Sequence, residues 1–340
     1  MFARAVDNDA EIQAVLKEAI LFSIDCEKGE GIELAKKYKV SGYPTFAMIN
    51  AQGDQTDRWI GYGGPENWAG NVREGLADRR TIVEKQQAYS KEPTLALSRS
   101  LARHAAASGE HKDAVTYFRK ARDLDAAAAA EYTNEILSTM YYGMRSEAFT
   151  FEDVEVEAKG VMASSSATAE DKVEVALMIL SVAKSTGQDE KAVPYITEAL
   201  AASEGTTDES VMDGRHFLQI DHALLVEKDG PKAVALRRQV LPEGWDEDPV
   251  QLNRFAWWCF ENNVNLEEAE ALALKGFELA DNDKQRANIL DTAAEICNAR
   301  GNCEEAIARI KQAIDLDPDK QYFKDQLARF EQAKEDKNSG

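Results

Sequence analysis

The sequence is poor in the residues that form reactive centres. Its 340 residues include four cysteines and four histidines. The cysteines, Cys26, Cys259, Cys297 and Cys303, are scattered and form no CxxC pair. A disulfide framework is therefore excluded, and free thiols that are buried or half-buried are expected. The histidines show neither HExxH nor another zinc-ligand spacing, so the sequence predicts no catalytic residue, no metal site and no cofactor.

Positive charge and long apolar runs are also scarce. Lysine plus arginine number 40 against 61 aspartates plus glutamates, which gives a net charge of −21. A field of that sign repels phosphate backbones and anionic lipid, so neither nucleic acid nor a membrane surface is an expected partner. No run approaches the ~18 apolar residues of a membrane span, and the opening MFARAVDNDAEIQ has acids where a signal peptide needs an apolar core. For the chain as written, the expected location is cytoplasmic.

Prolines number only eight, and one of them organises the first part of the chain. Pro44 lies in VSGYPTF, and because proline donates no N–H to a sheet ladder, it must precede the strand TFAMIN. The stretch GIELAKKYKV before it has helical spacing and ends at the turn residue Gly42. The same reasoning predicts a helix over 8–18, a strand AILFSID over 19–25, a strand QTDRWIGY over 55–62, and a helix that begins near Pro65.

This order of elements resembles the C-terminal three-quarters of a thioredoxin-like domain. The likeness rests on FSIDCEKGEGIELAKKYKVSGYPTF, on the strand through Trp59 and on the amphipathic last helix. It implies a cis bond before Pro44, and it implies that Tyr43, Pro44 and Thr45 bind an extended substrate through backbone groups. The strand and CxxC motif that the family carries upstream are missing, and Cys26 has no cysteine two positions away, so we expect Cys26 to be an apolar filler.

Loss of the family's central strand has a structural consequence. The strands AILFSID and TFAMIN would then pair with each other, leave unpaired backbone groups, or accept a strand from elsewhere. The resemblance favours a longer natural protein that begins upstream of Met1, and we would expect that longer protein to be periplasmic or exported. The alternative is a remodelled domain without the family's central strand.

Beyond residue 90 the sequence is helical, and it contains repeats. NILDTAAEICNARGNCEEAIARIKQAIDLDPD resembles a tetratricopeptide repeat, with small and large residues at the positions where that repeat has them, and two further stretches fit the same frame. The matching positions in the three copies are Gly301, Ala306, Ile310 and Ala313; Gly109, Ala114, Phe118 and Ala121; and Gly187, Ala192, Ile196 and Ala199. A weaker copy contains Ala269. Six or seven helix pairs are expected, with helix starts of capping-box type at Thr150, Thr168 and Thr206.

Together these patterns predict an α/β thioredoxin-like domain, incomplete, followed by an all-α tetratricopeptide-like helical solenoid. The expected boundaries are 1–80 for the first domain, 81–92 for a helical linker, 93–335 for the repeats and 336–340 for a disordered tail. Such repeats bind protein or peptide partners, and Trp245 and Trp258 are the candidate groove residues. The predicted function is that of a thiol–disulfide redox protein whose chain lacks the CxxC; the alternative is a non-catalytic protein-interaction scaffold.

Overall fold

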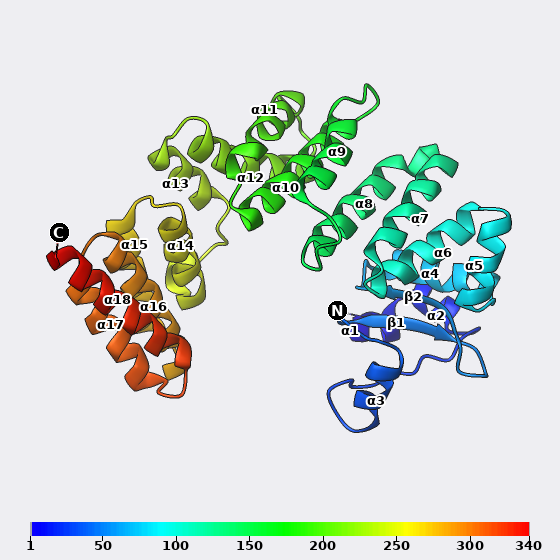
Figure 1. Cartoon of the computed structure of the whole chain (residues 1–340), viewed down its shortest axis with the longest axis horizontal. Coiled ribbons are helices and arrows are strands. Elements are labelled where there is room, and N and C mark those ends of the chain that lie inside the picture. Colours follow the sequence, from blue (N-terminus) through cyan, green and yellow to red (C-terminus); the bar gives the residue numbers. More distant parts are fainter. Residues whose placement is uncertain (1, 340) are drawn as a thin grey trace. The chain divides into compact units, whose positions relative to one another are not determined.

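The computed structural model describes residues 2–339, and the chain divides into two compact units at Gln188/Asp189 (Figure 1). The first unit contains a small sheet and the helices up to α10, and the second contains the helices from α11 onward. The first compact unit therefore extends well past residue 80, where the thioredoxin-like resemblance placed the end of the first domain.

The first unit begins with short helices around a two-stranded sheet. Its opening elements are α1 (Phe2–Asn8), α2 (Ala10–Val15), α3 (Glu30–Lys37), β1 (Thr45–Ile49), β2 (Gln55–Ile60) and α4 (Pro65–Ala77). The strands pair antiparallel, with Phe46 opposite Trp59 and Ala47 opposite Arg58. Trp59 is buried against α2 and α4, in a core that includes Ile12 and Trp68. Pro65 lies in the first turn of α4, as predicted, since its fixed φ suits a helix start.

The prediction of a strand over residues 19–25 is wrong. Residues 20–25 have no assigned secondary structure, and the sheet contains β1 and β2 alone among the described residues. The apolar pattern suits a strand, but a strand forms only where a neighbour completes its ladder. A two-stranded hairpin does not amount to a thioredoxin-like sheet, so that part of the expected fold is not supported. The cis bond expected between Tyr43 and Pro44 is confirmed.

The remaining helices of the first unit follow one another as antiparallel neighbours. They are α5 (Ile82–Lys91), α6 (Leu95–Ala107), α7 (His111–Leu124), the 3-10 turn η1 (Ala126–Ala128), α8 (Ala129–Met144), α9 (Phe151–Met162) and α10 (Ala169–Thr186). The expected linker over 81–92 is occupied by α5, which packs against both β2 and α6.

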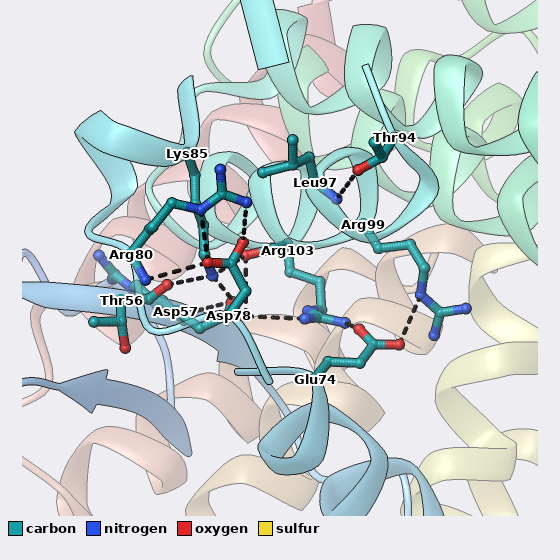
Figure 2. A network of polar contacts seen from close by, with 12 residues as sticks. Thr56, Asp57, Glu74, Asp78, Arg80, Lys85, Thr94, Leu97, Arg99 and Arg103 are labelled. Carbon is teal, nitrogen blue, oxygen red and sulfur yellow. Dashed lines mark hydrogen bonds and ion pairs between the residues drawn. The ribbon is translucent and has the colours of Figure 1, made fainter. Parts of the chain in front are cut away.

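A buried polar network joins the sheet to α5 and α6 (Figure 2). The Lys85 ammonium from α5 donates to the Thr56 carbonyl oxygen at 2.7 Å and to the Ser100 hydroxyl at 2.9 Å. The Asp57 carboxylate accepts from Ser100 at 3.0 Å and from Arg103 at 3.0 Å. Lys85 and Asp57 are fully buried, so β2, α5 and α6 depend on one another for satisfied charges.

The second unit is wholly helical. Its elements are η2 (Asp189–Ala192), α11 (Val193–Ala202), α12 (Glu209–Leu225), α13 (Gly230–Gln239), η3 (Trp245–Glu247), α14 (Pro249–Glu261), α15 (Leu266–Leu279), α16 (Asp283–Ala299), α17 (Cys303–Leu316) and α18 (Gln321–Ser339). Helix α18 reaches Ser339 and so includes most of the segment expected to be a disordered tail. Among residues 2–339, none of the helices combines the length and apolarity needed to cross a bilayer.

The helix pairs follow the predicted repeat positions. Ala114, Ala192 and Ala306 have no exposed surface, and the glycines at the three predicted turns have positive φ. Within the first unit α6 packs on α7 and α8 on α9, and within the second unit α12 packs on α13, α14 on α15, and α16 on both α17 and α15. Thr150 and Thr168 form capping boxes as expected. The start predicted at Thr206 is wrong, because Asp208 caps α12 by accepting from the Ser210 amide.

Candidate functional site

A groove of about 880 Å³ lies within the first unit, between the loops at one end of the sheet and the helices α6, α7 and α8. Four tyrosines line it, Tyr43, Tyr62, Tyr132 and Tyr142, and it is called the tyrosine groove below. Its volume falls in the range of ligand-binding cavities, which runs from about 300 to 1,000 Å³.

The loop that carries Tyr43 is fixed by backbone contacts. The Thr45 hydroxyl donates to the Gly42 carbonyl oxygen at 2.6 Å, and the Gly61 amide donates to the Pro44 carbonyl oxygen at 2.8 Å. The buried Arg58 guanidinium donates to the carbonyl oxygens of Tyr38 and Lys39 at 2.9 and 2.6 Å. These bonds hold the loop in place while the Tyr43 side chain, which is 64% exposed, remains at the rim of the groove.

Two arginines line the groove, and carboxylates engage both of them (Figure 2). Arg103 pairs with the buried Asp57 at 3.0 Å and with Glu74, while Arg99 pairs with Glu74 at 3.1 Å. Arg99 also donates to the Tyr132 hydroxyl at 3.2 Å. Asp57 also pairs with Lys85 at 3.8 Å, so two carboxylates share three cations and neutralise them only in part.

Two carboxylates in the groove make no direct contact of this kind with other described residues. Glu131 and Glu135 lie one turn apart on α8, so their side chains share one face of the helix. Neither makes a hydrogen bond or an ion pair within residues 2–339. Partial desolvation raises the pKa of Glu135, and the carboxylate of Glu131 raises it further against the opposing effect of Arg103. The groove thus presents two carboxylates on α8 that have no direct partner in the described part of the chain, although Arg99 acts electrostatically on Glu131 and Arg103 on Glu135.

Two further polar groups in the lining have no partner among the residues that the structure describes. They are the Nδ1 atom of His111 and the hydroxyl of Tyr62, both buried. Burial lowers the pKa of His111, so its ring is neutral near pH 7 and adds no positive charge to the groove.

The three residues predicted to bind substrate do not all line one cavity. Tyr43 lines the tyrosine groove, whereas Thr45 lines a second cavity and donates its hydroxyl to the Gly42 carbonyl oxygen. The Pro44 carbonyl is likewise bonded to Gly61. A binding role stays a prediction, and Tyr43 is the residue whose side chain is placed for it.

The two tryptophans predicted to line a groove lie in the second unit and are half-buried. The Trp245 ring packs on Phe255 with centroids 5.3 Å apart, and the Trp258 ring stacks on Phe255 at 6.0 Å. The Arg237 guanidinium lies over the Trp258 ring at 5.8 Å. Both rings thus contribute to the core packing of this unit, and a groove role for them stays untested.

Sequence reasoning missed the carboxylates of α8. The spacing of Glu131 and Glu135 in EYTNE was visible, but it did not show that this face of α8 lies opposite the loop of Tyr43. Only the packing of α6 to α8 against the sheet brings the two segments together.

The four cysteines are all free and include no dithiol pair. Burial raises the pKa of Cys259 to about 12 and that of Cys297 to about 11. A thiol with such a pKa is protonated near neutral pH and is a poor nucleophile. Thiol–disulfide exchange therefore has no support from these residues.

No family model matches the sequence, and no curated protein matches it. Among solved structures, YrrB, described as a TPR protein with an unusual peptide-binding site, is 16% identical with a TM-score of 0.35; the match covers 70% of this chain and 95% of YrrB. A tetratricopeptide repeat protein from Parabacteroides merdae is 16% identical with a TM-score of 0.42; that match covers 73% of this chain and 90% of the other. TM-scores below 0.5 do not establish a shared ligand.

Proposed function

We propose that this chain is a non-catalytic protein-interaction scaffold, and that the tyrosine groove binds an extended peptide segment carrying lysine or arginine. The observation that carries the proposal is the pair of carboxylates, Glu131 and Glu135, that make no direct ion pair or hydrogen bond among the described residues, in a groove walled by tyrosines. Tetratricopeptide-like helix pairs suit such a role because their stacked helices present extended surfaces to partners.

Exposed aromatic rings supply the apolar contacts of such a site. Tyr43 is 64% exposed and Tyr142 is 55% exposed, from the loop and from α8 respectively. A cationic side chain beside a tyrosine ring gains roughly 0.5–1 kcal/mol at an exposed site. The carboxylates of α8 line the same groove and also favour a cationic group, so rings and carboxylates select the same chemistry.

The net charge of −21 supports the same ligand. A field of this sign increases the encounter rate with a basic segment and disfavours an acidic one. Binding should therefore weaken as salt shortens the screening length, which is about 8 Å at physiological ionic strength.

The test uses a fluorescein-labelled ten-residue peptide with lysine at every third position and phenylalanine, alanine and serine between. Fluorescence anisotropy should show binding of this peptide and much weaker binding of the peptide with glutamate in place of lysine. The double variant Glu131→Gln, Glu135→Gln should lose about tenfold in affinity, which corresponds to ~1.4 kcal/mol. Tyr43→Ala should weaken binding without altering the salt dependence.

A matched control separates the groove from the overall charge. The double variant Glu261→Gln, Glu278→Gln changes the net charge equally at exposed helix positions of the second unit. It should bind the lysine peptide as the unchanged chain does. Equal losses in both double variants would show that only bulk charge attracts the peptide, and the proposed site would be wrong.

A further inference from the structure

The two edges of the small sheet differ in how their backbone groups are satisfied. Along the outer edge of β2, the Thr56 carbonyl accepts from Lys85 and the Arg58 amide donates to the Asp57 carboxylate at 2.8 Å. Helices α5 and α6 pack over this edge. An edge strand covered in this way is protected from pairing with another chain.

The outer edge of β1 has no such cover. The Gly61 amide donates to the Pro44 carbonyl oxygen. Every second residue from Pro44 onward, such as Phe46, therefore directs its backbone groups toward β2. Thr45 and Ala47 alternate with them and direct their backbone N–H and C=O groups away from β2. Those groups of Thr45 and Ala47 make no hydrogen bond within the part of the chain that the structure describes.

A second cavity, of about 760 Å³, lies along this open edge. Residues of β1 line one part of it, and residues 18–22 and Ile24 line another. The backbone from Ala19 to Ile24 makes no hydrogen bond to the other described residues, although its sequence is suited to a strand. Ile20 is 98% exposed and Phe22 is 75% exposed, so apolar side chains also lie uncovered there.

One buried polar group in the cavity lining also lacks a partner. Trp68 is only 3% exposed and lines the cavity, and its indole N–H makes no hydrogen bond among residues 2–339. A buried donor of this kind costs about 1–3 kcal/mol while it stays unsatisfied. Unpaired strand groups, exposed apolar side chains and this donor therefore border the same cavity.

We propose that the open edge of β1 binds an extended strand from a partner protein. The strand would add to the sheet by hydrogen bonds to Thr45 and Ala47, and its alternate apolar side chains would cover Ile20 and Phe22. Main-chain pairing supplies affinity in such strand addition, while the side-chain pockets supply selectivity. This site is a different cavity from the tyrosine groove, although Trp59 lines both, and the proposal does not depend on the function proposed for that groove.

Charge identifies the occupant among the possible strands. A second copy of this chain also carries a net charge of −21, so two copies repel each other as they approach edge to edge. A partner strand flanked by lysine or arginine is attracted instead. The occupant is therefore an alternating apolar strand with basic flanks, supplied by a different protein.

The test measures amide hydrogen exchange of the full chain with a nine-residue peptide that alternates valine and threonine between terminal lysines. The peptide should slow exchange at the Thr45 and Ala47 amides. The Phe46 amide, which already pairs with β2, should change little and serves as an internal reference. The same peptide with N-methyl groups on all of its residues cannot approach β1 closely enough along either of its own edges to pair with it and should not protect these amides.

Substitutions at exposed positions test the apolar contacts without unfolding the chain. Ile20→Ser combined with Phe22→Ser should weaken binding of the valine–threonine peptide at least tenfold. Val156→Ser, at a valine that is 70% exposed on α9, should leave the affinity unchanged.

Three outcomes would overturn the proposal. The first is unchanged exchange at Thr45 and Ala47 with millimolar peptide. The second is protection of these amides in the free chain together with a dimer in sedimentation, which would make a second copy the occupant. The third is protection of Thr45, Ala47 and residues 19–24 in the free monomer, which would show that the chain's own segment closes the edge.

Discussion

At the scale of single residues, the buried charges differ in how well they are paired. Lys85 is held by a carbonyl, a hydroxyl and the Asp57 carboxylate, and desolvation lowers its pKa while Asp57 opposes that shift. Asp291 on α16 has fewer polar partners, since one of its carboxylate oxygens is buried without a hydrogen bond. Desolvation raises the pKa of Asp291 to about 6, and Glu295 adds to that shift.

Asp291→Asn should therefore stabilise the protein above pH 6. Folded Asp291 binds its proton near pH 6 whereas an unfolded aspartate does so near 3.8, so the folded state loses stability as the pH rises between these values. At ~1.4 kcal/mol per pKa unit, the wild-type protein loses roughly 3 kcal/mol of unfolding free energy at most through this carboxylate. Urea midpoints should favour the variant at pH 8 and converge with the wild type toward pH 4.

Asp281→Asn is the matched control for this prediction, because Asp281 is exposed in the loop before α16. It should shift the midpoint little at either pH. A destabilised Asp291→Asn protein at pH 8 would mean that the Asp291 carboxylate makes net favourable contacts with Lys320 and Arg329.

At the scale of elements, the sequence predicted those whose signals are local. Pro44 before β1, the capping boxes at Thr150 and Thr168, and the buried alanines of the repeats all follow from short patterns. The segment over 19–25 has an equally clear strand pattern but no assigned strand, because pairing depends on a neighbour elsewhere in the fold. The tyrosine groove was missed for the same reason, since α8 and the Tyr43 loop are far apart in sequence.

Ala306→Leu tests the repeat packing at this scale. Ala306 is fully buried on α17, so the larger side chain should overpack the helix crossing and cost about 1–3 kcal/mol. Ala308→Leu places the same side chain at an exposed position of the same helix and should change stability by less than about 0.5 kcal/mol. Equal urea midpoints for the two variants would contradict the predicted repeat frame.

At the scale of the whole molecule, the polar network of β2, α5 and α6 joins the sheet to the helices across the boundary that the sequence predicted between two domains. The sequence placed a linker over 81–92, yet Lys85 from that stretch reaches the Thr56 carbonyl and Arg103 reaches Asp57. Charged residues on three elements thus join the sheet to the first helix pair. Such long-range pairing leaves no local pattern in the sequence, so composition and spacing do not reveal it.

The whole chain should not accelerate the reduction of insulin by dithiothreitol. Turnover needs an accessible thiolate and a second thiol close enough to resolve the mixed disulfide. Cys259 and Cys297 are buried with raised pKa values, and the described residues include no CxxC arrangement. Turbidity from precipitating insulin should therefore develop at the uncatalysed rate. A thioredoxin-like rate that Cys26→Ser abolishes would contradict this prediction, because the half-buried Cys26 would then be the nucleophile that the resemblance led us to dismiss.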